Sequence, residues 1–82
     1  MIDNVKQKIM EFIISEKNLL PSDIQEDTPL ISTGIIDSIS TLSLVDFIET
    51  TFNIQFEPFE VDQENLNTVQ KIADFILRKQ MN

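Results

Sequence analysis

The chain of 82 residues contains neither cysteine nor histidine. Without cysteine it has no disulfide framework and no thiolate of its own. Without histidine it lacks the usual zinc ligand and the usual general base. A small enzyme would have to rely on carboxylates, or on a serine with no visible base. The acidic residues also do not follow the Asp-x-Asp-x-Asp-Gly order of an EF-hand calcium loop. We therefore expect neither an enzyme nor a metal site.

Long hydrophobic runs and turn-forming residues are scarce as well. No apolar run is long enough to span a bilayer, and residues 1–4 lack the charged and apolar regions of a signal peptide. We expect a cytoplasmic protein with no membrane insertion. A single glycine and three prolines, among abundant Leu, Ile, Glu, Gln and Lys, favour helices over sheet. The length fits one small domain that spans residues 1–82.

Positive charge is missing from the middle of the chain. The six basic residues lie at the two ends, with no Lys or Arg between Asn18 and Gln70, and the net charge is −8. Nucleic acids and anionic membranes attract the opposite sign, so we expect neither as a partner. An acidic middle suits a protein partner with a basic docking face; the alternative is a merely soluble acidic surface. The acids of this middle are Asp23, Glu26, Asp27, Asp37, Asp46, Glu49, Glu57, Glu60, Asp62 and Glu64.

Apolar spacing predicts a first helix that ends at about Lys17. Asp3 or Asn4 can cap its start, and Met10 is expected to fill a gap beside its apolar stripe. The stripe consists of Val5, Ile9, Phe12 and Ile13.

A long connection follows, over residues 18–36. Pro21 and Pro29 keep it out of regular helix, and residues 22–24 are expected to form a brief helical turn. So long a connection in so small a domain is unusual and often functional. The residues expected to hold it against the core are Leu19, Leu20, Ile24, Leu30 and Ile31.

A second long helix is predicted over residues 38–52, with Asp37 as its N-cap. Its apolar residues cover more surface than one packing face needs. We assign Val45, Ile48 and Phe52 to the core, and we leave Ile39 and Leu42 open between the core and a partner protein. Leu44 and Phe47 are expected to widen the buried face.

Two more helices complete the prediction. Pro58 can start a short one at about residues 59–63, and Asn67-Thr68 can cap a last one. The stripe of this last helix is Val69, Ile72, Ala73 and Ile76, flanked by Phe75 and Leu77. The predicted fold class is all-α: a small bundle of three main helices plus one short helix, with a long loop between the first and second helices.

The stretch Gly34-Ile35-Ile36-Asp37-Ser38-Ile39-Ser40 contains the strongest chemical signal. Gly34 permits a turn that other residues resist, and Ser38 falls in the first turn of the second helix with its hydroxyl toward solvent. The N-terminus of a helix is a favourable place for a phosphate, although the charge of Asp37 opposes one. The alternative is an ordinary helix start, because Asp-Ser before an apolar run is common.

The order of these segments resembles the acyl carrier protein family, which includes the peptidyl and aminoacyl carrier proteins. The resemblance covers nearly the whole chain. The matching segments are residues 27–30 (Asp-Thr-Pro-Leu), residues 34–39 (Gly-Ile-Ile-Asp-Ser-Ile), Leu44-Val45, Ile48-Glu49, residues 52–54 (Phe-Asn-Ile) and residues 67–76.

This resemblance implies a specific function. Ser38 would carry a 4′-phosphopantetheine arm, transferred from coenzyme A by a phosphopantetheinyl transferase. The thiol of the arm would hold an acyl or aminoacyl group as a thioester, supplied by an adenylating acyl or aminoacyl ligase and passed to downstream acyl-transferring or modifying enzymes. The protein itself would catalyse nothing and would act as a monomer.

The resemblance also implies a docking surface on the second helix and the loop before it. The residues expected to contact partner enzymes are Asp37, Ile39, Leu42, Asp46 and Glu49. Each has a second interpretation: Asp37 as a cap, the two aliphatic residues as core, and the last two acids as a solvated face.

Several residues depart from the fatty-acid members of the family. Ile39 follows the serine where leucine is usual, and Ser40, Ser43 and Thr50 stand where acids are common. The segment 56–62 is also longer and more aromatic than its counterpart in typical fatty-acid carriers. The chain therefore looks nearer to freestanding aminoacyl or D-alanyl carriers, and we expect a specialised biosynthetic pathway rather than bulk fatty-acid synthesis. The alternative is an acidic helical protein-interaction module that is never modified.

Overall fold

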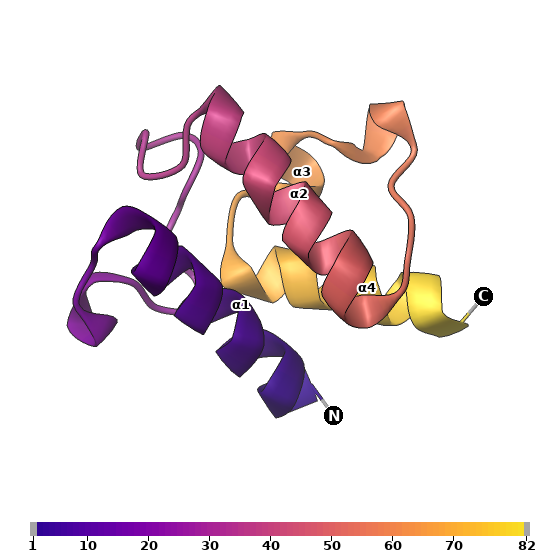
Figure 1. The fold of residues 1–82 in the computed structure, drawn as a ribbon, viewed down its shortest axis with the longest axis horizontal. Coiled ribbons are helices and arrows are strands. Elements are labelled where there is room, and N and C mark those ends of the chain that lie inside the picture. Colours follow the sequence, from indigo (N-terminus) through magenta and orange to yellow (C-terminus); the bar gives the residue numbers. More distant parts are fainter. Residues whose placement is uncertain (1, 82) are drawn as a thin grey trace.

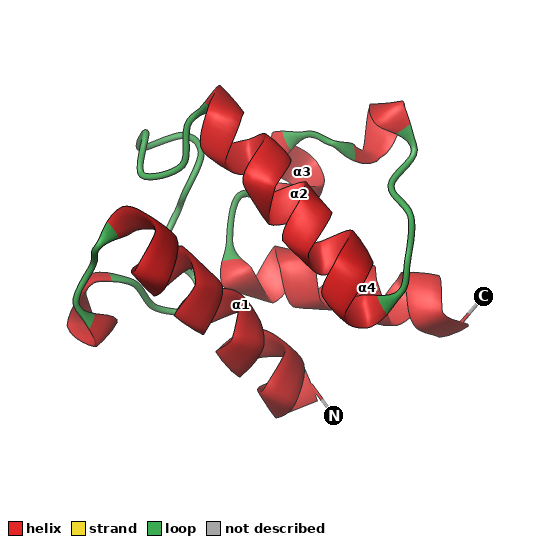
Figure 2. Ribbon diagram, viewed as in Figure 1, coloured by secondary structure: helices red, strands yellow, loops and turns green. Residues whose placement is uncertain are grey.

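A computed structural model describes residues 2–81, with the side chains from residue 4. The described chain contains the long helices α1 (Ile2–Lys17), α2 (Ser38–Phe52) and α4 (Val69–Met81), and the short helix α3 (Gln63–Leu66). Single 3-10 turns lie at Pro21–Asp23 and Pro58–Glu60. Figure 2 shows only helices and loops over this range. The predicted all-α bundle of three main helices plus one short helix is confirmed.

The helices surround a single apolar core, and α4 packs against both α1 and α3 (Figure 1). The predicted stripe of α4 is fully buried, and Phe75 beside it is only 3% exposed. Burial of each of the larger side chains among these residues stabilises the fold by roughly 1.5–3 kcal/mol. The buried residues are Val5, Ile9, Ile13, Ile24, Leu30, Ile36, Leu44, Ile48, Leu66, Val69, Ile72, Ala73, Phe75 and Ile76.

The start of α1 differs from the prediction. The helix already includes Ile2, so Asp3 and Asn4 lie inside its first turn and neither is the cap. Helical backbone is open to both residue types, so the helix extends past the position predicted for its cap. The end of α1 at Lys17 agrees with the prediction. Asn18 then adopts a left-handed conformation with φ 56°, a common way to end a helix.

The long loop between α1 and α2 is held by buried aliphatic side chains. Ile24, Leu30 and Ile36 are at most 3% exposed and belong to the core. Leu20 does not: it is 65% exposed, contrary to the prediction. Its N–H donates to the Asp23 carboxylate at 2.8 Å, which fixes the 3-10 turn at the surface and leaves the Leu20 side chain outside the core.

The buried face of α2 agrees with the prediction for Ile48, and Val45 and Phe52 pack against the core as partly buried residues. Leu44 and Ile48 are the buried residues of this helix, whereas Ile39 is 77% and Leu42 is 67% exposed. Val45 is only half-buried. Residues 44 and 48 lie one turn apart on one side of the helix, while residues 39 and 42 lie on another. The helix therefore turns part of its apolar surface away from the core.

The third helix was predicted at residues 59–63, and this prediction is wrong. Pro58 starts only a 3-10 turn that ends at Glu60. The helix α3 begins at Gln63 instead, because the Asp62 carboxylate accepts from the Asn65 N–H at 3.1 Å and caps it.

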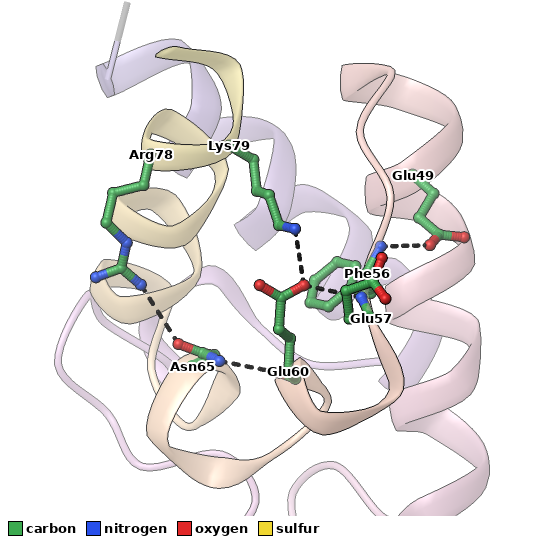
Figure 3. A network of polar contacts seen from close by, with 7 residues as sticks. All are labelled: Glu49, Phe56, Glu57, Glu60, Asn65, Arg78 and Lys79. Atoms are coloured by element: carbon green, nitrogen blue, oxygen red, sulfur yellow. Dashed lines mark hydrogen bonds and ion pairs between the residues drawn. The ribbon is translucent and has the colours of Figure 1, made fainter. Parts of the chain in front are cut away.

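Polar contacts fasten the segment between α2 and α3 (Figure 3). The Glu60 carboxylate accepts from the Glu57 N–H at 2.8 Å and pairs with the Lys79 ammonium at 2.8 Å. The bond from Lys79 is the main reason that the pKa of Glu60 lies below its ordinary value, and the bond from the Glu57 N–H acts in the same direction. The Asn65 amide bridges the Glu60 carbonyl and Arg78. The stacking of Phe56 on Phe75, with ring centroids 4.6 Å apart, completes the attachment to α4.

Candidate functional site

The loop before α2 makes a tight turn that ends at Ser38. Gly34 has φ 82°, a conformation that is costly for residues with a Cβ. The Gly34 N–H donates to the Ile31 carbonyl at 3.1 Å, and the Ile36 N–H donates to the Leu30 carbonyl at 3.0 Å. Ile36 is buried two residues before Ser38. The turn and this anchor together determine where α2 starts.

Asp37 is the N-cap of α2, as predicted. Its Oδ1 accepts from the Ser40 N–H at 2.8 Å, and its carbonyl accepts from the Thr41 N–H at 2.8 Å. Its extended backbone (φ −94°, ψ −173°) is typical of a cap. The bond from the Ser40 N–H is the main reason that the pKa of Asp37 lies below its ordinary value; the charge of Lys17 acts in the same direction.

Ser38 is the first residue of α2, and it is exposed. Its hydroxyl is therefore accessible to another protein, and it stands at the positive end of the helix dipole. The helix has no acidic residue in its first turn, and the carboxylate of the preceding Asp37 is bound to the Ser40 N–H. An exposed hydroxyl at a helix N-terminus fits a phosphodiester, because free N–H groups and the dipole both favour an anion there.

A cation near this helix start was missed by the sequence analysis. The Lys17 ammonium at the end of α1 donates to the Ser40 hydroxyl at 2.8 Å. Lys17 thereby ties the first turn of α2 to α1 and offsets part of the negative charge of Asp37. The contact joins residues 23 positions apart, and no periodicity in the sequence indicates such a pair.

The expected docking residues do not all lie free on the surface. Ile39, Leu42 and Asp46 are exposed, on the same side of α2 as Ser38 by helical spacing. Glu49 is half-buried, and its Oε2 accepts from the Phe56 N–H at 2.8 Å (Figure 3). This bond attaches the segment that follows α2 to the helix.

Asn67 contacts the loop before α2 and was also missed. It was expected to share the cap of α4, but Thr68 performs that task by accepting from the Lys71 N–H at 3.0 Å. The Asn67 Oδ1 instead accepts from the Ile31 N–H at 2.8 Å and the Ser32 N–H at 3.1 Å. Its backbone carbonyl accepts from the Leu30 N–H at 2.7 Å.

Little enclosed space lies beside the site. A cavity of about 10 Å³ between α1 and α2 has a lining that includes Lys17, Ile36, Ser40 and Leu44, enough for at most one water molecule. Within residues 2–81 no cluster of carboxylates could hold a metal ion. None of the helices described is both long and apolar enough to cross a membrane.

Comparisons with known proteins identify the family of the chain. Residues 7–76 match the family described as "Phosphopantetheine attachment site". The chain is 31% identical over 78 residues to the acyl carrier protein of Buchnera aphidicola, with 95% of each chain covered. It is 34% identical over 77 residues to the D-alanyl carrier protein of Lactococcus lactis, with 92% of this chain and 95% of the relative covered. It is also 34% identical over 76 residues to the D-alanyl carrier protein of Streptococcus suis, with coverage of 90% and 92%.

Proposed function

This chain belongs to the carrier proteins with a phosphopantetheine attachment site, and we propose that Ser38 carries the 4′-phosphopantetheine arm. When attached, the arm supplies a thiol that holds an acyl or aminoacyl group as a thioester, which explains how a chain without cysteine takes part in thioester chemistry. The observation that carries the proposal is the exposed Ser38 hydroxyl at the N-terminus of α2.

The residues around Ser38 position its hydroxyl and do not activate it. In the proposed attachment step Ser38 Oγ would bond to phosphorus while the pyrophosphate bond of coenzyme A broke, and the nucleotide part would leave. Asp37 is a poor base for the hydroxyl proton, because its pKa is lowered and its carboxylate is held by the Ser40 N–H. We therefore assign the proton to a group of the phosphopantetheinyl transferase, and on this proposal the chain itself catalyses nothing.

The exposed face of α2 is the proposed docking surface for partner enzymes. Ile39 and Leu42 offer apolar contact beside Ser38, and Asp37 and Asp46 can pair with basic residues of a partner. Asp37 is exposed, but Glu49 is half-buried and its carboxylate is bound to the Phe56 N–H, so we leave Glu49 out of this surface. The surface thus combines two apolar residues with two acids.

The cargo belongs to the same proposal. Ser40, Ser43 and Thr50 leave α2 with only two acids, Asp46 and Glu49. This distribution favours an aminoacyl or D-alanyl cargo, loaded by a separate adenylating ligase in a specialised pathway, over bulk fatty-acid synthesis. Residues 1–82 would act as one monomeric carrier domain in the cytoplasm.

The test is an intact mass of the protein after incubation with coenzyme A and a broad-specificity phosphopantetheinyl transferase, followed by peptide mapping. We expect one phosphopantetheine adduct on Ser38. Ser38→Ala should abolish the adduct, and Ser43→Ala, a change of the same size on the same helix, should keep it. No adduct on the folded chain, with a transferase that modifies a control carrier, would favour an unmodified acidic interaction module instead.

A further inference from the structure

Three consecutive N–H groups of the loop before α2 converge on one residue. The N–H groups of Leu30, Ile31 and Ser32 all donate to Asn67, the first to its carbonyl and the other two to its side-chain oxygen. The Asn67 amide nitrogen lies 3.4 Å from the Ser32 hydroxyl. Asn67 stands between α3 and α4, 35 to 36 residues away from Ile31 and Ser32 in the sequence.

Asn67 is connected to the start of α2 by a short series of hydrogen bonds. Leu30 donates to Asn67 with its N–H, and its carbonyl accepts from the Ile36 N–H at 3.0 Å. Ile36 directly precedes Asp37 and Ser38. On the other side, the Gln70 N–H donates to the Glu26 carbonyl at 3.0 Å. The loop is thus attached to the start of α4 at two places, and its last turn is built on the Asn67 attachment.

We propose that Asn67 is a positioning residue for the modification of Ser38. This inference rests on the proposed function. A transferase that reaches the Ser38 hydroxyl must approach the N-terminus of α2, which the exposed turn at residues 32–34 precedes in the chain. Transfer to a hydroxyl requires a defined distance and direction, and a displacement of about 1 Å can slow such a reaction by as much as a hundredfold. By fixing residues 30–32, Asn67 fixes the turn that the transferase meets.

The side chain of Asn67 is suited to this task, since one oxygen with two lone pairs accepts from two adjacent N–H groups. Alanine at this position would leave the Ile31 and Ser32 N–H groups without their partner. Aspartate would keep an acceptor in the same place. Comparing Asn67→Ala with Asn67→Asp therefore separates the effect of losing the acceptor oxygen from the effect of any substitution at this position.

The matched control is the adjacent Thr68. Its hydroxyl caps α4 by accepting from the Lys71 N–H, and it makes none of the contacts to residues 30–32. Thr68→Ala therefore weakens the same junction without releasing the loop. If slower phosphopantetheinyl transfer followed from lower stability alone, it would appear equally in Asn67→Ala and Thr68→Ala.

The experiment measures kcat/KM for phosphopantetheinyl transfer with the carrier as the varied substrate, well below the Tm of each variant. We expect Asn67→Ala to lower this value about tenfold, Asn67→Asp to restore most of it, and Thr68→Ala to stay within about twofold of the original chain. The KM for coenzyme A should not change. Amide hydrogen exchange should become faster at Ile31 and Ser32 in Asn67→Ala only.

Equal rates for Asn67→Ala and the original chain, or an equal defect in Thr68→Ala, would overturn the positioning role while leaving the carrier function intact. If the original chain itself takes up no arm, the proposed function fails first, and faster exchange at Ile31 and Ser32 would then report only a loop contact. The two failures are thus told apart by the unsubstituted protein.

Discussion

Two leucines on α2 should lose very different amounts of stability on truncation to alanine. Leu44 is 1% exposed and belongs to the core, whereas Leu42 is 67% exposed. Leu44→Ala removes three carbon atoms from the core, which is roughly 2.4 kcal/mol at about 0.8 kcal/mol each. The cavity left behind adds to this, so we expect a loss of about 3 kcal/mol. Leu42→Ala should cost less than about 0.5 kcal/mol.

Urea denaturation followed by circular dichroism measures both free energies of unfolding. A chain of this length has a stability of about 4–12 kcal/mol, so Leu44→Ala should still fold, with a Tm lower by roughly 12–24 °C. Equal destabilisation by the two substitutions would refute the assignment of the buried face of α2. The same two variants also test the docking surface.

Leu42→Ala should slow phosphopantetheinyl transfer about fivefold, which is about 1 kcal/mol of lost interaction with the transferase. Leu44→Ala, assayed at a temperature where it is folded, should be modified at nearly the original rate. A transfer rate unaffected by Leu42→Ala would remove this residue from the docking surface without changing its place in the fold.

The remaining predictions concern the attachment site and the response to acid. Ser38→Ala should abolish loading and change the free energy of unfolding by less than about 0.5 kcal/mol, as urea denaturation will show, because the cap is Asp37. Gly34→Ala should cost about 1–2 kcal/mol in the same assay; an added Cβ would meet nothing within 4 Å, so this cost comes from the positive φ alone. The pKa values of Asp37 and Glu60 are lowered in the folded state, so the stability from their ionised forms is fully present above their ordinary pKa values of 3.8 and 4.5. It is lost as the pH falls below these values through the lower pKa values of the folded state. A pH series of Tm values should show a smaller acid loss for Asp37→Asn than for the original chain; an identical loss would contradict the role of the Asp37 charge.

The boundaries of α2 could be predicted because local signals agree there. Asp37 is a good cap, Gly34 provides the turn before it, and the apolar spacing begins directly after Ser38. The structure has the same boundaries, Ser38–Phe52. Local hydrogen bonds within four residues are sufficient to define this start.

The buried side of α2 could not be predicted in the same way. Apolar residues occur around most of this helix, so two stripes fit the helical period: one through Ile39 and Leu42, and one through Leu44 and Ile48. Local spacing cannot choose between them, because the choice depends on where α1 and α4 supply a surface. The role of Asn67 could not be predicted for a related reason. Asparagine suits both a helix cap and a loop contact, and only the fold brings residues 30–32 near Asn67.

The contacts of Asn67 also have a consequence for the order of folding. They join segments about 35 residues apart, and contacts of such sequence separation form late because a long loop must close first. During synthesis, Ser38 leaves the ribosome well before Asn67 does. On the proposal that Asn67 positions the turn before Ser38, the surface offered to a modifying enzyme is complete only once residues 31–32 have bonded to Asn67.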